Sequence, residues 1–330
     1  MEEYGSQLWR GLPILSCRAE YKPDMNRREF MKVAAASVLA ATADGVNAKV
    51  FDTPQGEAER GLAVRFLGTG AADWNGPDAR GEHRRLSSLL LEREILIDFT
   101  PTDVEMLPEG CNPKTIFYTH SHGDHYHPAT ALKAGIEQVY LSESWYDIAV
   151  LDFRRAAAEL KLPMPEIHPL RIGEGVTIGE ITITPLPASH ATGYRFEQTL
   201  IYLIEKQGAR VIYATDTAGI PAIAARLAGI DAHDAKGKPI TGLIMEATMG
   251  QGEEQDTDFR IFTHSSVDCV DRIVKVLTKT KRYTPPTGQP VYLTHMARTL
   301  HPTQAELDKS LPKPLCAAYD GLEVVFRPAE

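Results

Sequence analysis

The sequence contains Thr115-Ile116-Phe117-Tyr118-Thr119-His120-Ser121-His122-Gly123-Asp124-His125, in which an apolar run passes directly into histidines and an aspartate. The first four residues are mostly β-branched or aromatic, and they predict a short buried strand. Three histidines and one aspartate then follow close together. A cluster this dense marks the end of the strand as the candidate functional site.

The spacing of these residues suits metal binding. His120 and His122 are two positions apart, so in an extended or tightly turning segment their imidazoles project to the same side and can bind one ion. We expect Gly123 to let the backbone bend sharply, after which Asp124 and His125 can point at a second metal position. The alternative is a histidine-rich surface loop that binds no ion. That interpretation would be preferred for a single isolated histidine, but the dense cluster argues against it.

The pattern His-x-His-x-Asp-His resembles the signature of the metallo-β-lactamase fold hydrolases. This resemblance implies a later histidine, an aspartate after a strand and a histidine near the C-terminus, and the matching positions are His190, Asp216 and His295. It assigns a first metal to His120, His122 and His190, and a second to Asp124, His125 and His295. The resemblance also implies that Asp216 lies between the two metals, a place that suits a carboxylate because its two oxygens can serve two cations. The alternative for Asp216 is a cap on the helix predicted from Ile220.

The expected cofactors are two divalent metal ions. All seven candidate ligands offer nitrogen or oxygen, which suits Zn²⁺ best, while Mn²⁺ or Fe²⁺ stays open because no thiolate selects against them. Asp98, at the end of a predicted strand, matches a family position that orients a ligand loop through hydrogen bonds.

Two further elements resemble ribonuclease Z and its phosphodiesterase relatives. Glu246-Ala247-Thr248 follows a predicted apolar strand, and His264-Ser265-Ser266 opens a predicted helix. In those enzymes a histidine backed by a glutamate faces the scissile phosphate, so the candidate catalytic residues are Asp124, His264 and Glu246. The alternative for His264 is a histidine near a helix start without a substrate role. The Asp-Gly turn before the last strand also resembles the carbon-phosphorus lyase phosphodiesterases.

The implied function is a dinuclear metal-dependent hydrolase that cleaves a small phosphodiester or cyclic phosphate by attack of a metal-bridged hydroxide. Ribonuclease Z carries a long arm for transfer RNA between its third histidine and bridging aspartate, and the segment from His190 to Asp216 is too short for one. The cysteine-rich zinc site of some phosphodiesterase relatives has no counterpart here. A lactonase or β-lactamase-like hydrolase and a non-catalytic small-molecule binding protein stay open as alternatives.

The predicted strands and helices alternate in two successive sets, each of which delivers candidate ligands from strand ends. Periodicity alone indicates a mixed α/β or α+β fold, and the resemblance implies a four-layer αβ/βα sandwich. The expected strands are 62–67, 86–91, 94–97, 115–118, 138–141, a pair over 176–185, 199–204, 210–214, 243–245, 291–294 and one within 318–326. The expected helices are 129–134, 143–160, one from about 220, 264–277 and 302–311.

Several other residues have two open interpretations. Arg84, Arg85 and Arg298 are candidates for gripping a phosphate, and the loop from Asp73 to Pro77 either borders a pocket or is a plain surface turn. His127 either lines the pocket or lies at the surface. The remaining histidines are expected to be surface or structural residues: His83, His168, His233 and His301.

Composition limits the partners of this 330-residue chain. It is 43% hydrophobic and 24% charged, enough to bury a sizeable core. Its net charge of −9 argues against a surface that binds nucleic acid through bulk positive charge. No apolar run reaches the roughly 18 residues that cross a bilayer. We expect a small-molecule substrate, no long nucleic acid and no membrane span, and a homodimer stays open.

The N-terminal region resembles a twin-arginine export signal. Asn26–Lys32 contains paired arginines, an Ala-rich stretch follows, and Val46-Asn47-Ala48 offers small residues for cleavage. We therefore expect a leader of unclear role over 1–24, with translation starting at Met25, a signal peptide over 25–48 and the hydrolase domain over 49–330. The protein would use the twin-arginine export machinery and be periplasmic or secreted. An amphipathic first helix is the alternative.

The four cysteines form no recognisable framework. Cys17, Cys111, Cys269 and Cys316 are scattered without Cys-x-x-Cys spacing, so they predict neither a zinc knuckle nor a disulfide scaffold. A single disulfide stays open.

Overall fold

The computed structural model describes residues 60–234, 236–256 and 258–329. The predicted leader, the export signal with its cleavage point, and Cys17 lie outside these residues.

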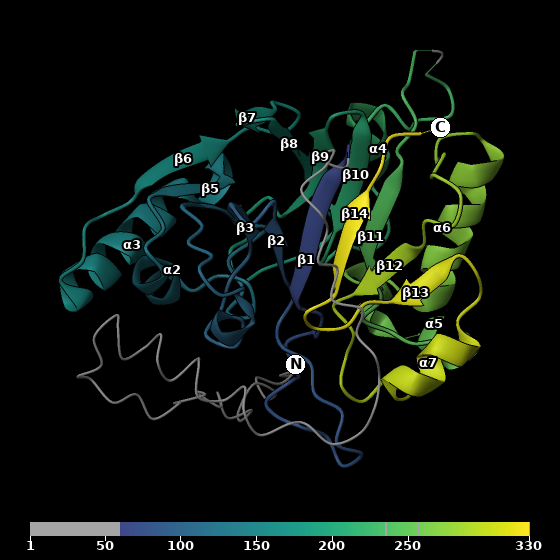
Figure 1. Cartoon of the computed structure of the whole chain (residues 1–330), viewed down its shortest axis with the longest axis horizontal. Coiled ribbons are helices and arrows are strands. Elements are labelled where there is room, and N and C mark those ends of the chain that lie inside the picture. The colour runs from purple at the N-terminus through teal and green to yellow at the C-terminus, as the bar shows by residue number, and fades with distance from the viewer. Residues whose placement is uncertain (1–59, 235, 257, 330) are drawn as a thin grey trace, which may run out of the picture. The chain divides into compact units, whose positions relative to one another are not determined.

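The described strands form two sheets of seven strands each (Figure 1). The first has the order β14-β1-β2-β3-β4-β5-β6 and the second the order β13-β12-β11-β10-β9-β8-β7. The bounds in the first sheet are β1 Leu62–Gly68, β2 Ser88–Leu91, β3 Ile95–Ile97, β4 Thr115–Phe117, β5 Gln138–Ser142, β6 Glu166–Leu170 and β14 Glu323–Phe326. Those in the second are β7 Val176–Ile178, β8 Ile181–Pro187, β9 Leu200–Lys206, β10 Ala209–Ala214, β11 Gly242–Glu246, β12 Val291–Thr294 and β13 Leu315–Ala317.

The two sheets repeat one pairing pattern. In the first, β3, β4, β5 and β6 pair in parallel, and in the second β10, β11, β12 and β13 do so, while the remaining neighbours are antiparallel. Ligand sites of α/β folds lie beyond the carboxyl ends of parallel strands. The chain places His120 after β4, Asp216 after β10 and His295 after β12. Both sheets therefore contribute strand ends to one candidate site.

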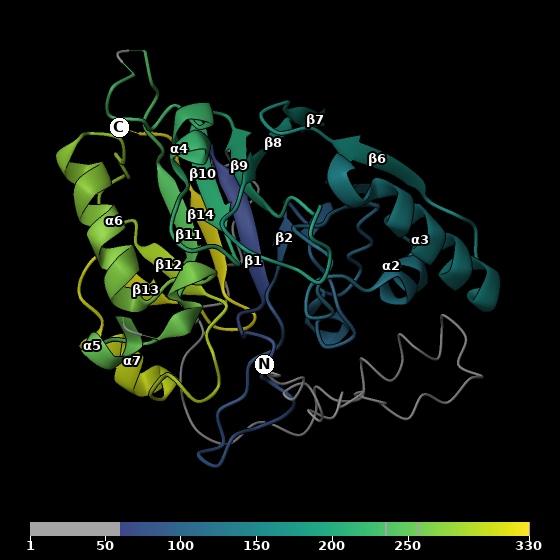
Figure 2. The same ribbon diagram turned by 180° about the vertical axis from the view of Figure 1, so that it is seen from behind.

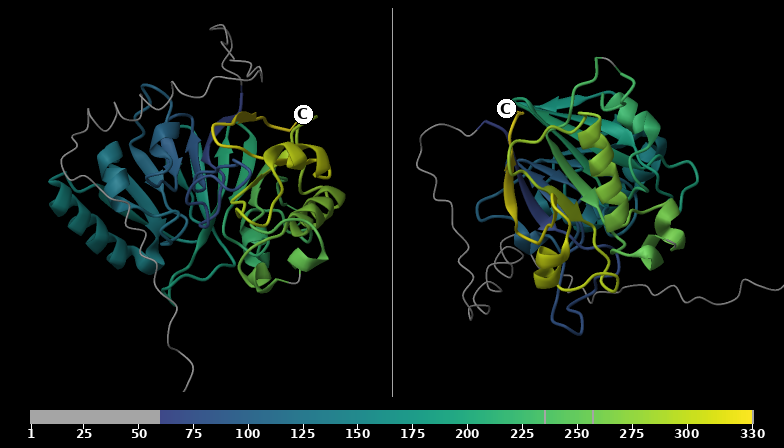
Figure 3. Two further views of the ribbon diagram at one scale, coloured as in Figure 1. Left: turned by 90° about the horizontal axis from the view of Figure 1, so that it is seen from below. Right: turned by 90° about the vertical axis from the view of Figure 1, so that its right-hand side faces the viewer.

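Helices cover the outer face of each sheet (Figure 2 and Figure 3). On the first sheet, α2 (Pro128–Ala134) and α3 (Tyr146–Leu160) pack against one apolar cluster. On the second, the covering helices are α4 (Ala222–Leu227), α6 (Val267–Lys279) and α7 (Gln304–Ser310). A third apolar cluster lies between the sheets. This four-layer αβ/βα sandwich confirms the predicted metallo-β-lactamase fold.

Strand periodicity explains how the sequence specifies the layers. In β3, Ile95 and Ile97 belong to the cluster between the sheets, whereas Leu96 belongs to the cluster under the helices. In β9, Tyr202 faces the other sheet and Leu203 faces the helices. Because successive side chains of a strand alternate faces, an unbroken apolar strand is buried on both sides.

Most expected elements are present with shifted ends, and two strands escaped prediction. These are β6 and β13, each of which lies at the edge of its sheet. Pro169 and His168 obscure the alternation of β6, and β13 has three residues. Glu143–Trp145 forms a 3-10 turn, η3, ahead of α3 instead of the first turn of one long helix.

Two negative findings hold for the described residues. No helix there combines the length and apolarity needed to cross a membrane. Among the described residues, Cys111, Cys269 and Cys316 form no disulfide with one another.

Candidate metal centre

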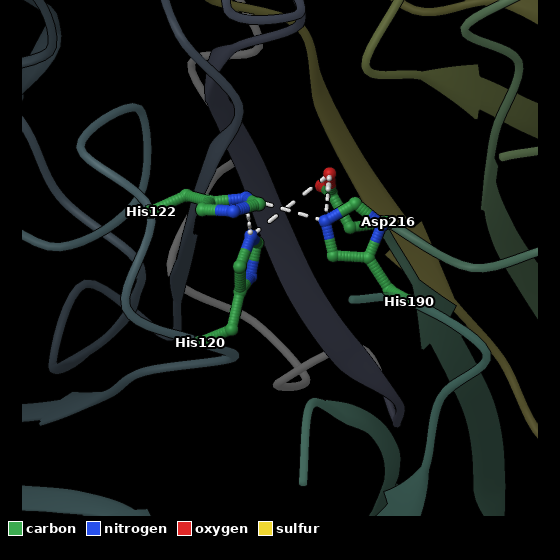
Figure 4. Close-up of side chains that lie close together, drawn as sticks. All are labelled: His120, His122, His190 and Asp216. Carbon is green, nitrogen blue, oxygen red and sulfur yellow. Dashed lines mark hydrogen bonds and ion pairs between the residues drawn. The ribbon is translucent and has the colours of Figure 1, made fainter. Parts of the chain in front are cut away.

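The structure brings all seven sequence-predicted ligands together, in two adjoining groups. In the first, one donor atom from each residue lies within 4.8 Å of the others, and the members are His120, His122, His190 and Asp216 (Figure 4). The second satisfies the same criterion and contains Asp124, His125 and His295. These residues come from loops after β4, β8, β10 and β12, so only the folded chain creates the site.

The donor atoms of the first group face one another closely. His120 Nε2 lies 2.9 Å from His122 Nδ1, which in turn lies 3.2 Å from His190 Nε2. Asp216 Oδ1 approaches His190 Nε2 at 3.6 Å and His120 Nε2 at 4.0 Å. Three imidazole nitrogens and one carboxylate oxygen therefore enclose one position, a donor set that suits zinc and related divalent metals.

The second group shares Asp216 through its other oxygen. Asp216 Oδ2 lies 3.0 Å from His125 Nε2 and 3.1 Å from His295 Nε2. Asp124 Oδ2 lies 3.3 Å and 3.4 Å from the same two nitrogens. Asp216 thus directs one oxygen to each group, and it does not cap α4, whose N-cap residue is Pro221.

Most of the histidine rings are fixed by a hydrogen bond at the nitrogen that points away from the site. His125 Nδ1 lies 2.8 Å from Asp98 Oδ2, and His295 Nδ1 lies 2.8 Å from Thr248 Oγ1. The other two fixed rings are His120, with Nδ1 3.0 Å from Thr119 Oγ1, and His190, with Nδ1 3.1 Å from the Thr263 carbonyl oxygen. Such partners set the ring orientation and tautomer of metal-binding histidines.

Asp98 has the supporting position that the sequence predicted. Besides contacting His125, its carboxylate accepts hydrogen bonds from the Thr119 backbone amide and hydroxyl, both at 2.8 Å. It therefore ties the end of β3 to the loop that carries His120.

Three residues at strand ends adopt left-handed backbone conformations. The φ angles are +56° at Asp98, +48° at Asp216 and +52° at His295. For residues other than glycine this conformation costs roughly 1–2 kcal/mol, and such strain concentrates at functional sites. At each position the chain turns abruptly after a strand.

The charges around the site favour bound cations. Burial opposes ionisation of Asp216, but the nearby rings of His295 and His125 hold its pKa well below the usual value. Burial likewise opposes protonation of His125, yet the carboxylates of Asp216, Asp124 and Asp98 raise its pKa well above the usual value. Burial lowers the pKa of His120, which keeps that ring neutral and its lone pair available. The second group therefore attracts positive charge.

An unpartnered nitrogen atom in the second group also indicates that these residues can hold a metal pair. His125 Nε2 is fully buried and has no hydrogen-bond partner, although it faces two carboxylate oxygens. A buried polar nitrogen without a partner costs free energy, and a cation at the second group would bind this nitrogen in place of the proton that the carboxylates favour.

Glu246 and His264, predicted as a pair, also meet beside the site. His264 Nδ1 lies 3.1 Å from Glu246 Oε2, and its ring stacks on His295 with centroids 5.6 Å apart. Glu246 accepts further hydrogen bonds from the Thr217 amide and from Thr248 Oγ1. Although burial opposes protonation, the Glu246 carboxylate raises the pKa of His264 to about 9.

Sequence reasoning missed two supporting residues. Thr248 Oγ1 contacts His264 Nδ1 at 3.2 Å as well as His295 Nδ1, so one hydroxyl joins both histidines. Glu197 accepts hydrogen bonds from the Ser121 amide at 2.8 Å and the Ser121 hydroxyl at 2.6 Å. The Glu-Ala-Thr resemblance could have indicated Thr248, but no sequence signal connects Glu197 with Ser121.

The predicted role of Gly123 was wrong. Its φ lies outside the left-handed range, and an added Cβ would meet nothing within 4 Å. The turn is held instead by the His122 carbonyl oxygen, which accepts from the amides of His125 at 3.0 Å and Tyr126 at 2.9 Å. This pattern resembles one helical turn, which most residues can adopt.

The three arginines considered for phosphate binding are engaged elsewhere. Buried Arg84 donates to Thr69 Oγ1 and to the Ala318 carbonyl oxygen, both at 2.7 Å. Arg85 pairs with Glu105 and Asp320. Arg298 donates to Asn75 Oδ1 at 2.6 Å and to the Pro77 carbonyl oxygen at 2.8 Å.

The Asp73–Pro77 loop supports the last candidate ligand. Trp74 is buried, and its Nε1 donates to the carbonyl oxygen of Met296, the residue directly after His295, at 2.7 Å.

Two of the histidines outside the candidate metal centre have structural roles. His127 caps α2, since its Nδ1 accepts from the Thr130 amide. His301 is buried, which agrees with the structural alternative for this residue and not with the surface one.

Comparisons with known proteins agree with this geometry. The beta-lactamase superfamily domain matches residues 95–296, more than half of the chain and the segment that holds all seven candidate ligands. No curated protein matches the sequence.

Solved structures with the same fold share little sequence with this chain. A diphosphatase from the PhnP family has 20% identity and a TM-score of 0.59, with 81% of this chain and 99% of that chain covered. Human tRNase Z, short form, has 18% identity and a TM-score of 0.55, with 80% and 99% covered. Yeast PDE1 has 12% identity and a TM-score of 0.52, with 81% and 99% covered.

The family match spans the strand ends and loops on which the two His/Asp groups converge. The chain therefore belongs to the beta-lactamase superfamily, as a metal-dependent hydrolase of the metallo-β-lactamase fold.

Proposed function

We propose that this protein hydrolyses a small phosphodiester or cyclic phosphate with two divalent cations, Zn²⁺ in the simplest case. The observation that carries the proposal is the Glu246–His264 pair, which lies against the seven candidate ligands. A hydrolase of lactones or β-lactams on this fold has no need of the pair.

The fold neighbours support the choice of substrate class. A diphosphatase, a tRNase Z and yeast PDE1 share this architecture at 20% identity or less. The short connection between His190 and Asp216 leaves no room for a long arm that would grip transfer RNA. A small substrate is therefore the proposal that fits the chain.

Each group in the site has a defined part in this proposal. His120, His122 and His190 would hold one cation, Asp124, His125 and His295 the other, and Asp216 would contact both. When bound, the cations supply Lewis acidity, which lowers the pKa of a water molecule and offsets charge on the ester oxygens.

The chain's own side chains would position the substrate and the proton donor. Glu246 and Thr248 hold Nδ1 of His264, which leaves Nε2 free to donate a hydrogen bond to a phosphate oxygen or the leaving oxygen. Donors fixed before the reaction stabilise charge that develops in the transition state. Asp124 would contribute by holding the second cation, together with His125 and His295, where it can face the reacting ester.

The test is His264→Ala in zinc-loaded protein. We expect turnover of bis-p-nitrophenyl phosphate to fall by about 10²–10⁴-fold, with metal content unchanged in plasma mass spectrometry. His233→Ala is the control, because His233 is exposed in the segment before β11, and Glu246 lies at the opposite end of that strand. Loss of a metal ion from the His264 variant would contradict the proposed role.

A substrate screen separates the alternatives. Rates on bis-p-nitrophenyl phosphate are compared with rates on nitrocefin and on lactones, under the same metal loading. Preference for a lactone or nitrocefin would contradict the phosphodiesterase proposal. Tight binding of small molecules without turnover of any ester would support the non-catalytic binding protein.

We propose in addition that the chain is exported by the twin-arginine route. The support is the paired arginines of Asn26–Lys32 and the Ala-rich stretch that follows. N-terminal mass spectrometry of the protein from its native source should find a mature chain beginning near Lys49. A cytoplasmic protein that retains residues 25–48 would contradict this proposal.

A further inference from the structure

Two exposed aromatic segments lie next to the candidate metal centre. Tyr194 and Phe196 belong to the loop that follows His190, with exposed fractions of 39% and 58%. Phe259 and Phe262 bound the short 3-10 helix η4 (Phe259–Phe262), with exposed fractions of 79% and 78%. Exposed aromatic side chains gathered near a site indicate a binding surface more often than isolated ones do.

The two segments converge on one ligand residue. His190 immediately precedes the first loop, and its Nδ1 hydrogen-bonds to the carbonyl oxygen of Thr263, the residue after Phe262. The His190 ring also contacts that of His264, with centroids 4.9 Å apart. Both segments are therefore tied to the edge of the site at which His264 lies.

The first loop is anchored at its base and middle, so its tip has a defined position. Glu197 binds Ser121, and its Oε2 also accepts from Thr192 Oγ1 at 2.6 Å. The Glu197 amide donates to the Tyr194 carbonyl oxygen at 3.0 Å, which closes the turn at the tip. At the base, the Gln198 amide donates to Ser144 Oγ at 2.8 Å.

The rings at this tip are arranged as a platform. Tyr194 and Phe196 stack with centroids 5.6 Å apart and an interplanar angle of 24°. Arg195, between them, is exposed and gives the tip a positive charge that suits an anionic ester. A fixed aromatic surface beside cations matches a ligand with a planar ring attached to a phosphate.

We propose that Tyr194, Phe196 and Phe262 form an aromatic subsite that binds a planar ring carried by the substrate, such as an aryl group or a nucleobase. The inference rests on the proposed function, which supplies the phosphodiester, and it names the ring as the feature that the protein selects. Glu197 holds the Tyr194–Phe196 tip against the loop of His120 and His122.

The first experiment compares two esters that share a leaving group. In zinc-loaded wild-type protein, the ratio of kcat/KM for bis-p-nitrophenyl phosphate to that for methyl p-nitrophenyl phosphate should exceed the ratio of their uncatalysed hydrolysis rates, because only the former leaves a second ring for the subsite. Phe196→Ala and Phe262→Ala should each lower kcat/KM for the bis-aryl ester about 3- to 10-fold and change that for the methyl ester less than about 2-fold.

The second experiment does not depend on turnover. Isothermal titration calorimetry with diphenyl phosphate should give a Kd about 3- to 10-fold higher for Phe196→Ala than for wild type, and Phe196→Tyr should restore it. Leu151→Ala is the matched control, because Leu151 is 56% exposed on α3, outside both segments. An unchanged Kd in Phe196→Ala and Phe262→Ala would overturn the inference.

Other occupants of this surface give different results. Sedimentation that shows a wild-type dimer and monomeric phenylalanine variants, with ester selectivity unchanged, would assign the rings to a chain–chain interface and overturn the inference. Binding of diphenyl phosphate that depends on the rings, in a protein that cleaves no phosphodiester, would support the subsite and refute only the proposed reaction. Cleavage of both esters without preference would support the proposed reaction and overturn the aromatic subsite.

Discussion

Asp216 connects the two groups of candidate ligands, because its two carboxylate oxygens face different groups and its backbone turns sharply after β10. Its two oxygens face different groups, at 3.6 Å from His190 Nε2 and 3.0 Å from His125 Nε2. Its φ of +48° is a conformation that residues other than glycine seldom adopt. The sequence predicted the aspartate by resemblance, but strand periodicity could not predict the turn that directs each oxygen.

His301 gives a prediction at the residue scale, on the pH dependence of stability. Its Nε2 donates to the Ala247 and Thr248 carbonyl oxygens at 2.7 and 3.2 Å, while Nδ1 is buried without a partner. Burial lowers the pKa of His301 from 6.5 to about 4. Folding therefore favours the neutral ring, and this contribution is complete above pH 6.5 and is lost as the pH falls toward 4.

We expect the free energy of unfolding to fall by roughly 3 kcal/mol between pH 7 and pH 4 because of this histidine alone. His301→Gln keeps a donor for the two carbonyl oxygens and cannot titrate. Urea denaturation of both proteins across this range should give a shallower pH dependence for the variant. Because both proteins share all other titrating groups, the difference between their pH dependences isolates the contribution of His301. If the free energy of unfolding depended on pH equally in both, the low pKa assigned to His301 would be contradicted.

At the scale of elements, the ends of parallel strands are the parts that the sequence predicted best. The apolar runs before His120, Asp216 and His295 all form strands, because each is a β-branched or aromatic run that ends in polar residues. β6 was missed because Pro169 argues against a strand except at a sheet edge, and β13 was missed because it has only three residues. Contacts between distant loops, such as Glu197 with Ser121, leave no periodic signal.

The contact between Glu197 and Ser121 gives a prediction about metal retention. Because Ser121 lies between His120 and His122, Glu197→Ala should weaken zinc binding by about 10- to 100-fold. Glu197→Gln keeps one acceptor oxygen and should lose less. Competition with a chromogenic chelator measures the affinity, and Glu205→Ala, on β9 away from the site, is the control. Equal zinc affinity in Glu197→Ala and wild type would contradict the anchoring role.

Two glycines give a matched prediction about the loops. An added Cβ at Gly68, where β1 ends, would lie 1.9 Å from the Leu86 carbonyl oxygen, whereas one at Gly123 would meet nothing within 4 Å. Gly68→Ala should lower the free energy of unfolding by at least about 2 kcal/mol. Gly123→Ala should change it by less than about 1 kcal/mol, with metal content kept.

Urea denaturation measures both glycine variants under one set of conditions. A destabilised Gly123→Ala would mean that the metal-binding loop needs glycine after all. A Gly68→Ala protein as stable as wild type would contradict the close backbone approach between β1 and the segment before β2.

At the scale of the molecule, two sheets with one pairing pattern bring distant strand ends to a common edge. The seven candidate ligands extend from His120 to His295, and no local segment contains both complete groups. Their identities could be predicted from sequence because a resemblance assigned them one at a time. Their convergence depends on the packing of Tyr202, Val211 and Ile244 against the first sheet, which a one-dimensional pattern does not encode.

The most direct test of the account is the number of zinc ions bound per chain. It is measured by plasma mass spectrometry after zinc loading and gel filtration, for the wild-type protein and for the variants Asp216→Asn and Asp147→Asn. The account predicts about two zinc ions per chain in wild type and in Asp147→Asn, whose side chain is exposed on α3. It predicts about one or fewer in Asp216→Asn. Trace metal in the wild-type protein, or two ions retained without the Asp216 carboxylate, would contradict it.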